Sequence, residues 1–178
     1  MNPNTTTTHD DGGNGTSKSM RDDLEDARQI NNYLNHYITV TDAKALGIVA
    51  GAFASGAFLL KDVPQSCSWV VVVYYVGVLL HAATVWLGLS VIYPRVPTRG
   101  SSVVFWEDVQ MRPSLRDYLK DFKAACENSF LDEEYASQNY LVSKVLHRKT
   151  ALMRWAIRLF VPALALGLIA YGAILHKS

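Results

Sequence analysis

Three long stretches of this chain contain no Asp, Glu, Lys or Arg, and this feature limits its fold more than any other. They lie between Lys44 and Lys61, between Asp62 and Arg95, and between Arg158 and Lys177. A soluble domain of 178 residues cannot easily bury three such stretches, whereas a bilayer core accommodates helices of about 20 mostly apolar residues. The pattern therefore predicts an all-α integral membrane protein with three transmembrane helices.

The predicted spans cover residues 45–60, 68–93 and 159–175. The first is slightly short for a bilayer core. The second is long enough to tilt, and Trp69 and Tyr93 lie near its ends, where interfacial aromatic residues are typical. Pro162 is expected to kink the third span or to mark its start, because proline removes a backbone hydrogen bond from a helix.

The remaining segments are polar. Residues 1–19 are too rich in Thr, Gly, Asn and Asp to repay the entropy of ordering, so a disordered tail is expected. Residues 20–44 predict an amphipathic helix, because apolar residues recur there at three- and four-residue steps. Residues 95–158 hold 11 of the 17 basic and 8 of the 16 acidic residues and predict a helical region in water. No strong helix breaker lies between Glu133 and Val161, which leaves open whether a helix continues into the third span.

Periodicity assigns faces to these helices. On residues 20–44 the expected apolar face is Leu24, Ala27, Ile30, Leu34, Tyr37 and Thr41, and the expected polar face is Asp22, Asp23, Glu25, Arg28 and Asn31. In the later region one apolar stripe consists of Leu115, Leu119, Phe122, Cys126 and Phe130. We expect the helix of residues 20–44 to pack against other helices of the chain.

The distribution of basic residues predicts the topology. Six of them flank the inner ends of the second and third spans: Arg95, Arg99, Arg148, Lys149, Arg154 and Arg158. The opposite side carries only Lys61 and Lys177. Because cytoplasmic loops are enriched in Lys and Arg, the N-terminus and residues 95–158 are expected in the cytoplasm.

Small residues in the first span suggest close helix packing. Gly47, Gly51 and Ser55 share one face, and Ala52 with Gly56 makes a second pair at the same four-residue spacing. Such residues let helices approach closely, either within the chain or between copies of it. Both interpretations stay open, and a homo-oligomer is expected.

Ionisable groups inside the spans are scarce. His81 lies in the middle of the second span, and no carboxylate accompanies it in any span. We expect a neutral imidazole bonded to a carbonyl or to Ser55, although an ionisable residue in a membrane is always a candidate functional group. A Ser55–His81 catalytic dyad is a remote alternative, because Phe53 replaces the first glycine of a Gly-x-Ser-Gly motif.

Other chemistry is not indicated. Cys67 and Cys126 are predicted on opposite sides of the membrane, so we expect two unpaired thiols and no metal site. The chain has no phosphate-binding glycine loop, and its net charge of +1 argues against a nucleic-acid polymer as partner. We expect neither an enzyme nor a resident cofactor, but passive spans attached to a regulatory region.

A set of short motifs resembles a known family. The segment Thr41-Asp42-Ala43-Lys44-Ala45, the Pro94-Arg95 exit, Val104-Phe105-Trp106-Glu107-Asp108-Val109 and Gln138-Asn139-Tyr140 occur in this order, followed by Lys144, Val145, Lys149, Met153 and Arg154. Over roughly residues 24–175 this arrangement resembles the transmembrane Pycsar effectors, the PycTM family.

The resemblance implies a role in anti-phage defence at the bacterial inner membrane. A partner pyrimidine cyclase would make cyclic CMP or cyclic UMP, and the nucleotide would activate the effector to impair the bilayer and abort the infection. A non-enzymatic adaptor that docks a soluble partner through residues 95–158 is the alternative.

A cyclic nucleotide requires a cation for its phosphate, an aromatic face for its base and polar groups for its edges. The expected ligand residues are Arg95, Trp106, Asp108, Gln138, Lys144 and Lys149, with Phe105, Asn139, Tyr140 and Arg154 as further candidates. Asp42 and Lys44 are expected to be structural polar residues where the first span begins, and to pair with Asp108 or Lys149.

Overall fold

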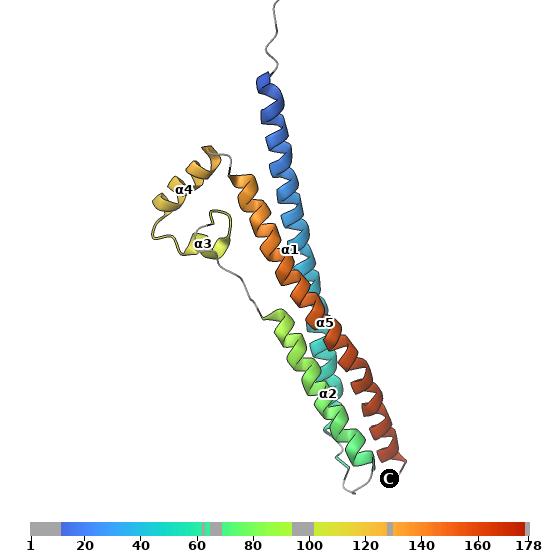
Figure 1. The fold of residues 1–178 in the computed structure, drawn as a ribbon. Helices are drawn as coiled ribbons and strands as arrows, with labels where there is room; N and C mark the ends of the chain where they lie inside the picture. The colour runs from blue at the N-terminus through green and yellow to red at the C-terminus, as the bar shows by residue number, and fades with distance from the viewer. Residues whose placement is uncertain (1–11, 62, 65–68, 94–101, 128–129, 177–178) are drawn as a thin grey trace, which may run out of the picture. The chain divides into compact units, whose positions relative to one another are not determined.

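The computed structural model describes residues 12–61, 63, 64, 69–93, 102–127 and 130–176, and all of their regular structure is α-helical. The helices are α1 (Gly12–Leu59), α2 (Trp69–Ile92), α3 (Trp106–Gln110), α4 (Leu115–Glu127) and α5 (Leu131–Leu175) (Figure 1). Helices α1, α2 and α5 are each long and apolar enough to cross a membrane. The predicted all-α membrane fold with three spans is confirmed.

Helix α1 runs without a break from Gly12 to Leu59. It joins the predicted amphipathic helix to the first predicted span and begins within the expected tail, of which residues 1–11 lie outside the described residues. Extending an existing helix costs much less than nucleating a new one, because each added residue gains a hydrogen bond. A polar segment attached to a stable span can therefore remain helical.

Helix α5 shows that a helix continues into the third span, which the sequence left open. It continues from Leu131 to Leu175, so the helix expected from Glu133 onward and the third span form one element. Pro162 lies inside the helix. Transmembrane helices tolerate proline because neighbouring helices and local adjustments satisfy the freed backbone groups.

The chain divides into two compact units. Unit 1 comprises Met1–Tyr33 with Thr98–Leu141, and unit 2 comprises Leu34–Pro97 with Val142–Ser178. Helices α1 and α5 contribute residues to both units, α3 and α4 belong to unit 1, and α2 belongs to unit 2.

In unit 2 a seven-residue repeat organises the packing of α1, α2 and α5. The buried positions of α2 recur at alternating steps of four and three: Val70, Tyr74, Gly77, His81, Thr84, Gly88 and Val91. Buried residues on the other two helices recur every seven: Ala45, Ala52 and Leu59 on α1, and Ala156, Ala163 and Ala170 on α5. A repeat of this period keeps one seam of each helix facing its neighbours, as in left-handed helical bundles.

Glycines allow the closest approaches in this unit. At Gly88 an added Cβ would overlap Val49 Cγ2, and at Gly167 it would lie 2.8 Å from Leu59 Cδ1. At Gly51 it would lie 3.2 Å from Phe160 Cζ, whereas Gly47 has no such neighbour within 4 Å. Gly51 and Ala52 thus pack inside the unit, as the intramolecular interpretation of the small residues expects.

The face predicted for residues 20–44 is wrong at two positions in unit 1. Asn31, expected on the polar face, is 8% exposed, whereas Ile30, expected on the apolar face, is 51% exposed. The Asn31 side-chain amide donates to Asn139 Oδ1 at 2.9 Å, and the Asn139 amide donates to the Ala27 carbonyl at 2.8 Å. Burying an amide costs little when it is hydrogen-bonded, so a specific partner on α5 overrides the hydrophobic pattern.

Candidate ligand site

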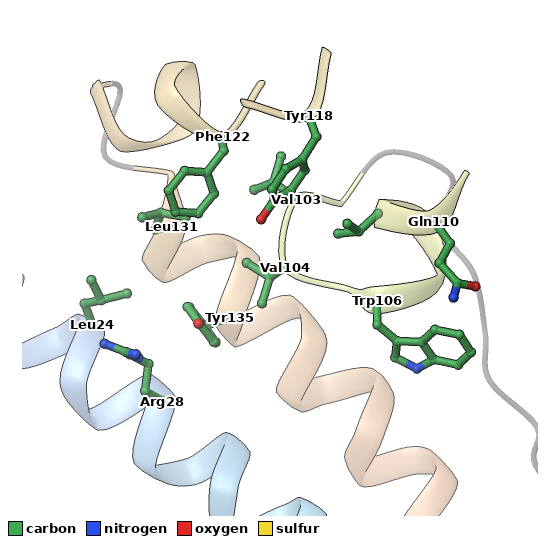
Figure 2. A pocket seen from close by; sticks show the side chains of 11 residues that line it. Leu24, Arg28, Val103, Val104, Trp106, Gln110, Tyr118, Phe122, Leu131 and Tyr135 are labelled. Carbon is green, nitrogen blue, oxygen red and sulfur yellow. The ribbon is translucent and has the colours of Figure 1, made fainter. Parts of the chain in front are cut away.

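A cavity of about 560 Å³ lies in unit 1, a size typical of small-molecule sites. Its apolar wall consists of Leu24, Val103, Val104, Val109 and Leu131. Trp106, Tyr118, Phe122 and Tyr135 supply aromatic rings, and Arg28 and Gln110 supply polar groups. These side chains come from α1, α3, α4, α5 and the segment before α3 (Figure 2).

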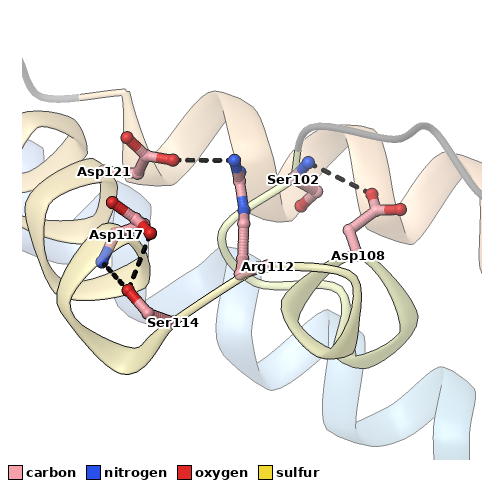
Figure 3. A network of polar contacts seen from close by, with 6 residues as sticks. All are labelled: Ser102, Asp108, Arg112, Ser114, Asp117 and Asp121. Carbon is pink, nitrogen blue, oxygen red and sulfur yellow. Dashed lines mark hydrogen bonds and ion pairs between the residues drawn. The ribbon is translucent and has the colours of Figure 1, made fainter.

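The hydroxyl of Ser102 holds the segment before α3 in place. It accepts hydrogen bonds from the backbone N–H groups of Val104 and Phe105, both at 3.2 Å, and donates to Glu134 Oε2 on α5 at 2.6 Å. The backbone N–H of Ser102 donates to Asp108 Oδ2 at 3.1 Å (Figure 3). Asp108 is 1% exposed. This network fixes the position of Val103 and Val104 in the cavity wall and of Trp106 at the start of α3.

Helix α4 is fixed by local polar contacts of its own. Ser114 precedes the helix, and its hydroxyl accepts from the Asp117 N–H at 3.2 Å and donates to the Asp117 carboxylate at 2.7 Å. This is an N-terminal cap, because it satisfies a backbone donor that has no partner within the helix. Arg112 also forms an ion pair with Asp121 at 2.7 Å (Figure 3). These contacts set the start of the helix that presents Tyr118 and Phe122 to the cavity.

The cavity lining combines three kinds of recognition chemistry. Arg28 is exposed and has no ion-pair partner among the described residues, so its guanidinium is available to an anion. Trp106, whose indole is half-exposed, and the aromatic rings of Tyr118, Phe122 and Tyr135 offer faces that can stack on a planar group. The exposed Gln110 amide can both donate and accept hydrogen bonds. The lining therefore suits a small anionic molecule with a planar ring.

Comparison with known proteins identifies the family. The family model of the Pycsar effector protein domain, PycTM, matches residues 26–176. The chain belongs to the PycTM family of Pycsar effectors. It is therefore a membrane protein of Pycsar antiviral defence.

A curated member of the family is also similar. Pycsar effector protein SaPycTM of Staphylococcus aureus is 25% identical over 149 residues, which cover 82% of this chain and 88% of that protein. No solved structure matches the chain. The match to a PycTM protein over most of both chains agrees with the family resemblance of the sequence motifs.

Among the predicted ligand residues that the structure describes, Trp106 lines the cavity of this PycTM member. Asp108 instead bonds the backbone of Ser102. Gln138 belongs to the same unit, and its Oε1 atom is buried without a hydrogen-bond partner among the described residues. Arg95 lies outside the described residues.

The remaining predicted residues lie in unit 2. Lys144 is exposed, and Lys149 is 8% exposed and donates to Asp42 Oδ1 at 2.5 Å. The pairing of Asp42 with Lys149 is one of those expected from the sequence. Lys44 is exposed. The structure thus divides the predicted ligand residues between the two units and engages Lys149 in an ion pair.

Two polar residues of the cavity were not predicted from the sequence. Arg28 was assigned to the solvated face of its helix, and Gln110 was not singled out. One signal was present, because Leu24 and Arg28 are four residues apart and such residues share a helix face. Which part of that face borders a cavity depends on the position of the segments from residues 103–135.

A second buried polar cluster lies in unit 2. His81, which is 3% exposed, places Nδ1 2.8 Å from the Gly77 carbonyl and Nε2 3.0 Å from Ser55 Oγ. Ser55 Oγ also lies 2.7 Å from the Gly51 carbonyl. The imidazole bonds both partners expected for it, a carbonyl and Ser55. These contacts satisfy its polar groups, as a membrane interior requires.

Proposed function

We propose that this chain is a cyclic-nucleotide-gated membrane effector. Its ligand would be cyclic CMP or cyclic UMP from a partner pyrimidine cyclase, and the activated chain would impair the inner membrane and abort infection. The observation that carries the proposal is the cavity of about 560 Å³ in unit 1, where Arg28 and Gln110 accompany four aromatic residues. No catalytic role is assigned to any residue in this proposal.

Each part of a cyclic pyrimidine nucleotide has a chemical counterpart in the cavity. We assign the cyclic phosphate, which carries one negative charge, to the Arg28 guanidinium, because charge-assisted hydrogen bonds are among the strongest. We assign the planar base to the face of Trp106 and the edge of the base to the Gln110 amide. In this assignment Asp108 is a positioning residue for the loop, and Lys149 a structural one.

The composition and packing of the helices in unit 2 support the proposal that the activated chain impairs the membrane. Helices α1, α2 and α5 are long and apolar enough to fit a lipid bilayer, and the buried imidazole of His81 bonds the Gly77 carbonyl and the Ser55 hydroxyl. We propose that activation changes the packing or the assembly of these helices and so makes the bilayer leaky. The homo-oligomer expected from the sequence is part of this proposal.

The experiment measures nucleotide binding to the full chain in lipid nanodiscs by calorimetry, with cyclic CMP, cyclic UMP, cyclic AMP and cyclic GMP. Losing a charge-assisted hydrogen bond costs about 1.5–3 kcal/mol, so Arg28→Gln should weaken binding of the preferred pyrimidine nucleotide by about 10- to 100-fold. Arg116→Gln is the matched control, because Arg116 is an exposed arginine of the same unit that does not line the cavity.

A dye-release assay completes the test. Liposomes that contain the full chain should release dye on addition of the nucleotide that binds, and the Arg28→Gln variant should need a correspondingly higher concentration. If neither cyclic CMP nor cyclic UMP binds, the proposal fails and the adaptor interpretation of residues 95–158 takes its place. Equal affinity of the Arg28→Gln and Arg116→Gln variants would refute the assignment of the phosphate.

A further inference from the structure

Helix α4 has one broad apolar face, and only part of it is used within unit 1. Tyr118 and Phe122 face the cavity, and Ala125 is 9% exposed. Leu115 and Leu119 are 72% and 44% exposed, and Cys126, which lies on the same side of the helix, is also exposed. We call Leu115, Leu119 and Cys126 the α4 strip. The strip leaves the side chains of Leu115 and Leu119 exposed, next to the part of the same face that lines the cavity.

Cationic side chains adjoin the α4 strip on the side away from the cavity. Arg116, Lys120 and Lys123 recur there at steps of four and three residues, and all three are exposed. None has an ion-pair partner among the described residues. Glu127 is the acid on the same flank. The border of the strip therefore carries three cations and one anion.

The other acids of α4 lie on a different flank and are already engaged. Asp117 bonds the hydroxyl of Ser114, and Asp121 pairs with Arg112 (Figure 3). These contacts keep their carboxylates on the side of the helix away from the strip. Because Asp117 and Asp121 lie on the other flank, the exposed apolar residues of the strip lie next to an excess of positive charge.

We propose that the α4 strip binds an anionic membrane surface. Leu115 and Leu119 would enter the boundary between headgroups and acyl chains, and Arg116, Lys120 and Lys123 would reach the lipid phosphates. This is the arrangement of an interfacial helix, which combines apolar residues with flanking Lys and Arg whose stems extend along the boundary. The charge of the strip's border favours an anionic bilayer over a protein surface of no particular charge.

The membrane-spanning helices also favour a membrane surface as the partner of the α4 strip. The three apolar helices of this chain anchor it in a bilayer, so α4 remains at a high effective concentration relative to lipid. The interaction goes beyond the proposed function, because it requires no nucleotide. In this proposal α4 has two roles, since one edge of its apolar face lines the cavity and the adjoining strip binds lipid.

The test compares two label positions on opposite sides of α4 in the full chain. With Cys67→Ser, Cys126 is the single cysteine and carries an environment-sensitive fluorophore within the strip. The control combines Cys67→Ser, Cys126→Ser and Ala124→Cys, which moves the label to an exposed position on the opposite side. Both proteins are reconstituted in phosphatidylcholine vesicles with or without phosphatidylglycerol, and quenching by spin-labelled lipid is measured.

We expect quenching at position 126 to exceed that at position 124 several-fold in vesicles with phosphatidylglycerol. The excess should shrink in pure phosphatidylcholine, at high salt, and in a Lys120→Gln/Lys123→Gln variant, because salt and charge removal both weaken attraction to anionic lipid. Equal quenching at both positions would overturn the proposal. Efficient disulfide formation between copies through Cys126, without lipid quenching, would assign the strip to a second copy and would overturn it as well.

Discussion

The ammonium group of Lys149 is buried beside the carboxylate of Asp42, at the end of the seam that Ala156, Ala163 and Ala170 continue at seven-residue steps. A basic residue in such a position is tolerated only with a partner, because an unpaired buried charge is expensive. The ion pair therefore explains how Lys149 occupies a seam position that is otherwise filled by alanine. The same contact makes Asp42 a structural residue of unit 2.

Replacing Asp42 tests this role. Asp42→Asn should lower the free energy of unfolding by about 1–3 kcal/mol, because it leaves the Lys149 ammonium buried without its counter-ion. The loss should fall below the 3–5 kcal/mol typical of fully buried pairs, since the Asp42 side chain is 32% exposed. The measurement is denaturant unfolding of the full chain in detergent micelles.

Two variants control this experiment. Lys44→Gln should change stability little, because Lys44 is an exposed charge of the same region without an ion-pair partner among the described residues. Adding Lys149→Gln to Asp42→Asn should recover part of the lost stability, because it removes the unpaired charge. If Asp42→Asn and Lys44→Gln cost the same, the pair does not stabilise the unit.

At the scale of helices, the seven-residue repeat and the glycines together determine how closely α1, α2 and α5 pack. Gly88 lies in the buried seam of α2, against Val49 of α1. A larger residue there must displace Val49, whose branched side chain has little freedom to rotate. The close approach of α1 and α2 therefore depends on the missing side chain at this position.

Gly88→Ala should destabilise the chain by about 1–3 kcal/mol, the usual cost of overpacking, despite the better helix propensity of alanine. Gly172→Ala is the matched control, because nothing lies within 4 Å of the place where its Cβ would be. Adding Val49→Ala to Gly88→Ala should relieve the overlap. The stability of the unchanged chain and of the three variants is measured by thermal unfolding in nanodiscs. Equal stability of the two glycine variants would show that α1 and α2 are less closely packed at Gly88.

At the scale of the whole molecule, the distribution of basic residues predicts which side of the membrane each segment occupies. The two cysteines test this prediction, because Cys67 lies in the loop expected outside and Cys126 in the region expected inside. In spheroplasts, an impermeant maleimide should label the Cys126→Ser variant, which retains Cys67. It should label the Cys67→Ser variant, which retains the exposed Cys126, only in inverted vesicles. The reverse pattern would contradict the positive-inside assignment.

Much of the fold could be predicted from the sequence, but little of the candidate site. The charge-free stretches identify the three helices that are apolar enough to span a membrane. Of the predicted ligand residues within the described part of the chain, Trp106 lines the cavity. The cationic residue that lines it is Arg28, which was not among the predicted ligand residues. The cavity assembles side chains from residues 24–28 and 103–135, and helix periodicity does not determine which surfaces of such distant segments meet.

The sequence by itself determined that the chain is helical and crosses a membrane, because a bilayer tolerates only apolar segments whose backbone groups bond internally. Its motifs also determined the family. Only the tertiary structure decided that Asn31 is buried and Ile30 exposed, which of the expected pairings Lys149 makes, and that Arg28 borders a cavity. The physical reason is the same in each case: a polar side chain is buried or available according to the partner that packing brings to it, and that partner lies far away in the sequence.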